Sequence, residues 1–129
     1  MQQVSLSDIP EVFARLESSS SYPAFAVFIF APPDRPASAD SVNIQFSMED
    51  RRPGFDWVLL SPTNIEDRAR FLEFAESKGY EAQEFEMNNV RYLRIENGDL
   101  VQLCSDVISE MYGLQRSEPI ALIAEGFSW

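Results

Sequence analysis

Apolar residues follow a helical period at the start of the chain. Those between residues 9 and 16 have the i, i+3, i+4, i+7 spacing of one helical face and are Ile9, Val12, Phe13 and Leu16. Asp8 and Glu11 form a variant of the capping box, and Pro10 falls in the first turn, where its missing N–H is not needed. We predict a first helix that ends at the serine run of residues 18–21.

The period then changes to that of strands in three successive segments. Residues 22–31 (YPAFAVFIFA) are apolar on both faces, which is typical of a strand that is covered on both sides. Residues 41–48 (SVNIQFSM) alternate between apolar and polar, and residues 55–61 (FDWVLLS) form a third strand candidate. The short connections between these segments favour an antiparallel arrangement.

A second helix is predicted from Thr63 to Lys78. Thr63 and Glu66 form a capping box after Pro62, and Gly79 suits the position after the last helical turn. The expected core stripe consists of Ile65, Ala69, Leu72 and Ala75. The apolar side chains beside that stripe are Phe71 and Phe74. Such a wide apolar arc indicates a helix that is covered on two sides or that offers a contact surface.

The most highly charged stretch, residues 84–99 (EFEMNNVRYLRIENGD), falls within a predicted hairpin. Residues 80–87 and 90–97 form its strands, and Asn88-Asn89 between them tolerates the positive φ of a primed turn.

The register of this hairpin separates its carboxylates. Glu86 lies opposite Arg91 as a cross-strand ion pair, Glu84 lies on the same face, and Glu96 lies on the other face. A calcium loop would place its oxygen ligands at alternate positions around a glycine, which is not the pattern here. We therefore predict a hairpin with a charged face rather than a metal or proton-transfer site.

A third helix and a last strand complete the pattern. The helix spans residues 100–112, and its apolar stripe consists of Leu100, Leu103, Cys104, Val107, Ile108 and Met111. Gly113 followed by Leu114 predicts a Schellman ending, and Cys104 is expected to be a buried apolar residue rather than a reactive thiol. Residues 118–127 (EPIALIAEGF) form the last strand candidate.

The order of elements, α-β-β-β-α-β-β-α-β, predicts an α+β fold: an antiparallel sheet with helices packed on one face. At 129 residues we expect a single domain over residues 1–129. No glycine-rich phosphate loop is present.

Composition argues against catalysis. The chain has no histidine and one cysteine, which removes the commonest general base, the usual activated nucleophiles and any multi-cysteine zinc site. We expect no enzyme activity, no catalytic residues, no metal and no cofactor.

Charge and hydropathy limit the classes of partner and the compartment that we expect for this protein. Twenty-one acidic residues against ten basic ones give a net charge of −11, which disfavours nucleic acid and anionic membranes and favours a basic protein partner. The apolar run at residues 24–31 is too short to cross a membrane as a helix, and the first residues lack a signal-peptide pattern. One unpaired cysteine suits a reducing compartment, so we expect a cytoplasmic protein.

The element order resembles that of a known group of chaperone domains. Residues 6–113 are similar in order to the bacterial type III secretion chaperone and YbjN-like group of peptide-binding domains. The closing segment RYLRIENGDLVQLCSDVISEMYGL carries the resemblance, together with the first amphipathic helix before three strands, and residues 118–127 add a strand to that pattern. The resemblance implies a non-catalytic acidic protein, often a homodimer, that holds an extended segment of another protein.

Two functional hypotheses remain open. The first is a chaperone-like module that binds a segment of a partner through surplus apolar residues, with Phe71, Phe74 and Trp129 as expected anchors. The second is an immunity protein of a toxin–antitoxin pair that neutralises a basic secreted toxin, for example a nuclease, by electrostatic complementarity. The carboxylates expected to contact a basic partner are Glu66, Asp67, Glu73, Glu76, Glu84 and Glu86.

Overall fold

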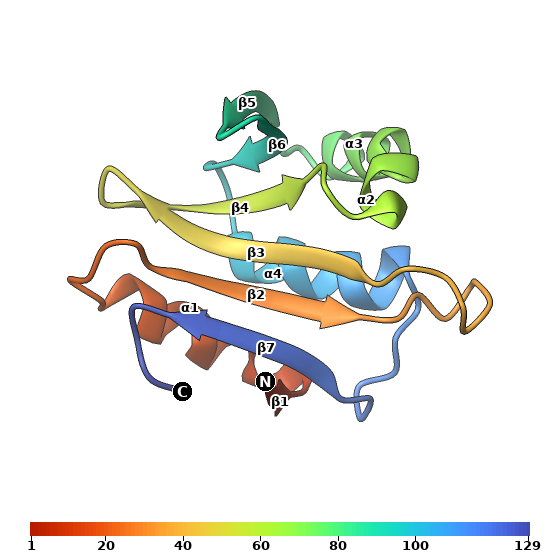
Figure 1. Ribbon diagram of the computed structural model, residues 1–129, viewed down its shortest axis with the longest axis horizontal. Coiled ribbons are helices and arrows are strands. Elements are labelled where there is room, and N and C mark those ends of the chain that lie inside the picture. Colours follow the sequence, from red (N-terminus) through yellow and green to blue (C-terminus); the bar gives the residue numbers. More distant parts are fainter.

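The alternation of side chains along the strands gives this protein a sheet with one covered face and one uncovered face. The computed structural model describes residues 1–129 and contains seven antiparallel strands in the order β1-β7-β2-β3-β4-β6-β5 (Figure 1). Helices α1 and α4 lie behind the sheet in this view. The predicted α+β class, with helices on one face of an antiparallel sheet, is confirmed.

The elements have the following bounds. The strands are β1 (Gln2–Val4), β2 (Phe25–Phe30), β3 (Val42–Glu49), β4 (Arg52–Val58), β5 (Gln83–Met87), β6 (Val90–Ile95) and β7 (Ile120–Glu125). The helices are α1 (Ile9–Glu17), α2 (Pro62–Glu66), α3 (Arg68–Ser77) and α4 (Leu100–Asp106). A 3-10 turn, η1 (Leu6–Asp8), precedes α1, and a π-helical turn, η2 (Val107–Met111), follows α4. None of the helices has the length and apolar run that a bilayer crossing requires.

The last strand is inserted between two earlier ones. β7 pairs with β2 on one side and with β1, which the sequence pattern did not predict, on the other. Figure 1 accordingly shows both ends of the chain at the same side of the sheet. The sheet edges are therefore the short β1 and the hairpin strand β5.

Aromatic side chains fill the core between the sheet and the helices. The indole of Trp57 stacks on the ring of Phe71 at 4.6 Å and lies parallel to the ring of Tyr112 at 6.5 Å. Phe71 also stacks on Phe55 at 5.7 Å. Because such pairs add to the free energy gained by burying their area, this stack fixes α3 and the end of η2 on β4.

The predicted second helix is two helices, and only the second half of its predicted core stripe is confirmed: Ala75 is buried and Leu72 packs against the core. The chain leaves the helical conformation at Asp67 (φ −92°, ψ 11°), so α3 does not continue the phase of α2. Phe71 is fully buried, whereas Ile65 is 54% exposed and Ala69 is also exposed. The carboxylate of Asp67 accepts hydrogen bonds from Arg35 and from the hydroxyl of Tyr112, and these distant partners hold the break.

The start of this region is anchored by polar side chains rather than by the predicted capping box. The helix begins after Ser61, with Pro62 at its first position, and Thr63 instead donates its hydroxyl to the carbonyl of Asp40. The buried amide of Asn64 pairs with both backbone groups of Asn43, accepting its N–H at 3.1 Å and donating to its C=O at 2.7 Å. Asn64 thus provides partners for backbone groups at the start of β3, just before its pairing with β4 begins.

The hairpin has the predicted turn and register. Asn88 and Asn89 have φ values of 52° and 65°, and Glu86 lies opposite Arg91, with 3.7 Å between Nε and the carboxylate. The predicted helix ending at Gly79 is also confirmed, with a positive φ and a bond from the Tyr80 N–H to the Ala75 carbonyl. Gly113 has a positive φ too, but Leu114 donates to the Ile108 carbonyl, one residue further back than in a Schellman ending, because the helix finishes in the π-helical turn η2. Local signals thus predicted the hairpin turn and the ending at Gly79 correctly.

Phe71 lies in the core where the sequence predicted Ile65, and we expect this difference to be measurable as a free energy of unfolding. Phe71→Ala should lower the free energy of unfolding by about 3–5 kcal/mol because it empties a stacked core position. Ile65→Ala should change it by less than about 0.5 kcal/mol. Urea denaturation of the two variants measures the difference, and Phe71→Leu gives an intermediate loss if Phe71→Ala does not fold. Equal losses for Phe71→Ala and Ile65→Ala would contradict the break at Asp67.

Candidate functional site

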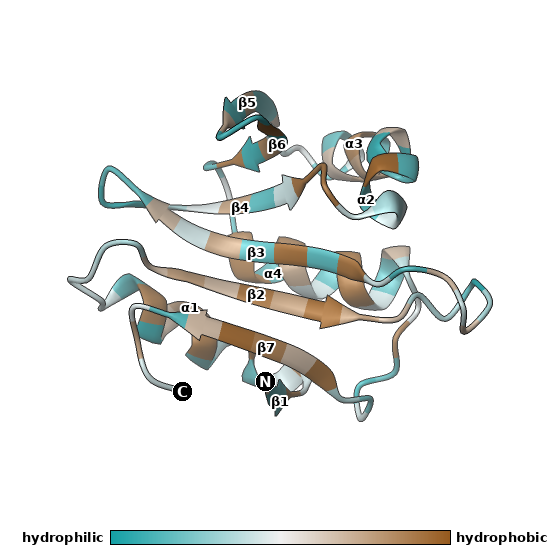
Figure 2. Ribbon diagram, in the orientation of Figure 1, coloured by the Kyte–Doolittle hydropathy of each residue, from teal (hydrophilic) through white to brown (hydrophobic).

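The face of the sheet opposite the helices carries apolar side chains that no element covers; we call it the open face. Phe25, Val27 and Ile29 of β2 point to it and are half-buried, so the expected cover on both sides of residues 22–31 was wrong. Ile123 of β7 lies beside Val27 and is 38% exposed. Figure 2 shows that β2 and β7 are apolar along most of their length.

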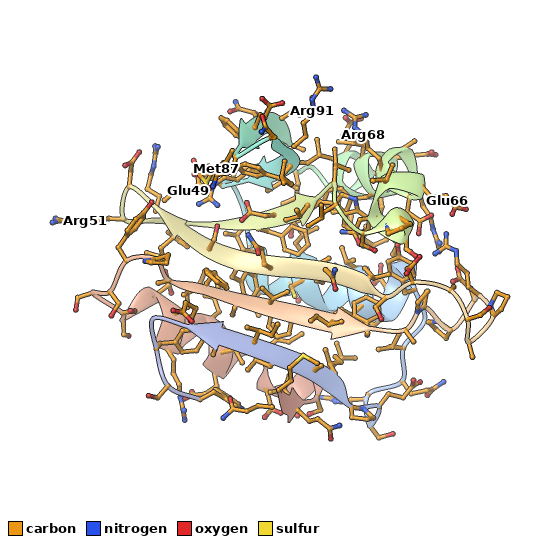
Figure 3. All side chains as sticks on the ribbon, in the orientation of Figure 1. Glu49, Arg51, Glu66, Arg68, Met87 and Arg91 are labelled. Carbon is orange, nitrogen blue, oxygen red and sulfur yellow. The ribbon has the colours of Figure 1, made fainter.

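A cleft of about 320 Å³ crosses the open face beside the β5–β6 hairpin. Eight of its thirteen lining residues are hydrophobic. Phe25 lines it from β2, Val58 from β4, and Met87 and Tyr92 from the hairpin. Glu49, at the end of β3, lies at the same end of the molecule as Met87 (Figure 3). The cleft is lined by residues from five strands, β2 to β6.

A buried ion pair forms the floor beneath this cleft. The side chains of Arg94 and Asp56 are each 1% exposed, and Nη1 of Arg94 donates to the Asp56 carboxylate at 2.9 Å. The same carboxylate accepts hydrogen bonds from Gln45 at 2.8 Å and from the Ser47 hydroxyl at 2.5 Å. Gly54 leaves room for the guanidinium, since a Cβ at this position would lie 2.3 Å from Cζ of Arg94.

The surroundings of Arg94 hold more negative than positive charge. Glu49 and Glu96 lie 3.3 Å and 2.8 Å from the guanidinium, so three carboxylates face it, counting Asp56. Arg52 is a distant second cation, 4.0 Å from Glu96. Burial opposes the charge on Arg94, but the carboxylates outweigh it and raise the pKa of the guanidinium.

Tyr92 links the floor to the wall of the cleft. Its hydroxyl donates to Glu49 at 3.2 Å. Burial, together with the negative charge of Glu49, raises the pKa of Tyr92 to about 12. The tyrosine is therefore a neutral hydrogen-bond donor at neutral pH.

Asp67, predicted as a contact carboxylate, is only 4% exposed and belongs to a second polar cluster within the protein. Burial acts against its charge, but hydrogen bonds from Arg35 and Tyr112 lower the pKa of the carboxyl. Arg70 lies over the ring of Tyr112 with its guanidinium 4.9 Å from the centroid. This cluster holds the loop after β2 against α3 and η2.

All three predicted aromatic anchors lie in or against the protein itself. Phe71 is fully buried in the core stack, so it cannot contact a partner in this structure. Phe74 is half-buried beneath Lys78, 5.2 Å from its ring centroid. Trp129 is half-buried, with the guanidinium of Arg15 4.5 Å from its ring.

The predicted contact carboxylates on the surface do not gather around the cleft. Glu66, Glu73 and Glu76 are exposed on α2 and α3, and Figure 3 shows Glu66 at the opposite end of the molecule from Glu49. Glu84 accepts a hydrogen bond from Arg68 at 2.7 Å, which lowers the pKa of its carboxyl, and Glu86 faces Arg91.

The single cysteine lies in the core. The thiol of Cys104 is fully buried, and burial raises its pKa, so it stays protonated at neutral pH. No three carboxylate or cysteine side chains converge in a way that could hold a metal ion.

No protein-family model, curated protein sequence or solved structure matches this chain.

Substitutions in the buried ion pair should show that Arg94 and Asp56 are energetically coupled. Arg94→Met and Asp56→Asn should each lower the free energy of unfolding by about 3–5 kcal/mol, because each leaves a buried partner uncompensated. The double variant should lose less than the sum of the two single losses.

Chemical denaturation of the three proteins measures this coupling. Arg52→Met is the control, because Arg52 is exposed and its loss should cost less than about 0.5 kcal/mol. Strict additivity of the two single variants would contradict a direct interaction between the buried charges.

The raised pKa of Tyr92 predicts a loss of stability at high pH. The neutral form is favoured in the folded state, so its contribution is complete below the ordinary value of 10.0 and is lost as pH rises through about 12. Tyr92→Phe should make the free energy of unfolding fall less steeply between these values. It should also remove one group that titrates near pH 12 from the tyrosinate absorbance. Tyr22→Phe is the control, and persistence of that group in Tyr92→Phe would contradict the assignment.

Proposed function

We propose that this protein is a non-enzymatic protein-binding module, chaperone-like in action, that holds a basic segment of a partner protein against its open face. The observation that carries the proposal is the row of uncovered apolar side chains on β2 and β7. A central strand that exposes Phe25, Val27 and Ile29 to water leaves apolar area that a partner can bury.

Charge supports a basic occupant over an acidic or neutral one. The whole chain carries a net charge of −11, and the cleft on the open face is lined by two carboxylates and no cation. Such a field attracts basic segments over a distance and disfavours anionic ones. Apolar contact would then hold the segment in place after it arrives.

The exposed acids of α2 and α3 favour a second candidate function. Glu66, Glu73 and Glu76 stand free on the outer side of these helices and could meet the lysines and arginines of a basic toxin. In that case the protein acts as an immunity protein, and the open face does not contact the toxin.

A pair of matched isoleucine variants distinguishes these functions. Tagged wild-type protein, Ile123→Asp and Ile65→Asp would be used as baits in a lysate of the native host, at low and moderate salt. Both isoleucines are exposed, but Ile123 lies on the open face and Ile65 lies on α2. We expect a basic partner that wild type and Ile65→Asp retain and Ile123→Asp loses at least about tenfold, because a buried charge replaces an apolar contact.

Other outcomes would overturn the proposal. Equal retention by Ile123→Asp, with loss on raising salt and in the double variant Glu73→Gln/Glu76→Gln, would support the immunity function instead. A homodimer in light scattering that Ile123→Asp dissociates would show that a second copy covers the open face.

A further inference from the structure

We propose that the cleft on the open face receives an arginine side chain of the partner segment, with its guanidinium beside Glu49. This inference rests on the proposed function and specifies which residue type the site recognises. It is built from three features of the cleft: its walls, its partly exposed carboxylate and the occupied donors of its floor.

The walls fit a long side chain with an apolar stem. Val58, Met87 and Val90 offer aliphatic surface, while Phe25 and Tyr92 offer aromatic rings. A cleft of about 320 Å³ lies at the small end of the range of ligand pockets and accommodates one or two side chains rather than a folded element. The stem of arginine packs on aliphatic surface, and its planar head stacks on aromatic rings.

Glu49 is the carboxylate that a ligand can reach. Its side chain is 34% exposed, whereas that of Asp56 is 1% exposed and already accepts three hydrogen bonds. Because the carboxylates around Arg94 outnumber the cations, Glu49 keeps negative charge available to a second cation. Oε2 of Glu49 already faces Tyr92 and Arg94, so a guanidinium of the ligand would donate to Oε1. Its planar head can at the same time stack on the aromatic rings of the wall, which an ammonium group cannot do.

The floor of the cleft has no free donor of Arg94 for an anion, so the cleft should bind cations and not anions. Arginine has five N–H donors, and Arg94 uses all of them within the protein. Nε donates to Glu96, Nη1 to Ser47 and Asp56, and Nη2 to the carbonyls of Ser47 and Arg52. No donor is left for a phosphate or carboxylate ligand. The cleft therefore selects a cation with an apolar stem.

The test uses the full chain and two blocked tripeptides that differ only in charge. Acetyl-Val-Arg-Val-amide and its citrulline analogue, which is neutral and of nearly the same shape, would be titrated into the isotope-labelled protein. Binding would be followed by amide chemical shifts. We expect saturable shifts at Val58, Val90 and Tyr92 with the arginine peptide and about tenfold weaker binding of the citrulline peptide, since an ionised partner roughly doubles a hydrogen bond.

Three variants locate the interaction. Glu49→Gln should weaken the arginine peptide about tenfold, while it still offers an acceptor to Tyr92. Glu73→Gln removes the same charge from α3 and should leave the affinity unchanged. Met87→Arg places an arginine of the protein itself at the cleft, at a position that is 52% exposed, and should block the peptide without disturbing the fold.

The inference fails if both peptides bind equally, if Glu49→Gln binds as wild type does, or if the shifts map to α3. It also fails if no saturable shift occurs. These failures differ from failure of the proposed function: a partner lost by Ile123→Asp but unaffected by Glu49→Gln and Met87→Arg would use the open face without arginine recognition.

Discussion

The guanidinium of Arg94 connects three strands on a face of the sheet that no helix covers. It extends from β6, binds Asp56 and the carbonyl of Arg52 on β4, and binds Ser47 on β3. A buried charge of this kind is tolerated because every donor has a partner and the opposing carboxylate is itself hydrogen-bonded. This contact also requires a glycine at position 54, where a side chain would overlap the guanidinium, and a register that places Asp56 of β4 opposite Arg94 of β6. The rigid floor of the cleft depends on it.

The consequence is a face with two chemical characters. Around Arg94 the polar groups satisfy one another, so this part of the sheet needs no covering helix. Beside it, Phe25, Val27 and Ile29 have no such partners and remain in contact with water. On the opposite face the corresponding positions Ala26, Phe28 and Phe30 are buried beneath the helices. Both faces of β2 are therefore apolar, and they differ in that helices cover only one of them.

The features that could be predicted from the sequence are those that a few adjacent residues determine. The hairpin at Asn88-Asn89 and the helix ending at Gly79 were predicted correctly because each requires a particular backbone conformation from a few adjacent residues. The phase of α3 was not predictable in this way, since Arg35 and Tyr112 hold the break at Asp67 from 32 and 45 residues away. The insertion of β7 between β1 and β2 is likewise a long-range choice.

The candidate site was missed for a related reason. A strand that is apolar on both faces indicates burial on both sides or an uncovered contact surface, and the sequence pattern does not separate these. Arg94, which lies between the apolar residues Leu93 and Ile95 in the strand VRYLRI, was the available signal that its face of the sheet is partly buried.

The two candidate functions use different parts of the same acidic surface. Acids on α2 and α3 stand on the helical side, away from the uncovered apolar residues, and can contribute only charge to an interface. Glu49 stands beside apolar walls, where a cation that binds it also loses water and gains contact area. An interaction held by the helical acids alone weakens steeply with salt because exposed charges are screened. An interaction centred on Glu49 combines a partly desolvated ion pair with apolar burial, and so its affinity should outlast the salt concentration that removes purely electrostatic binding.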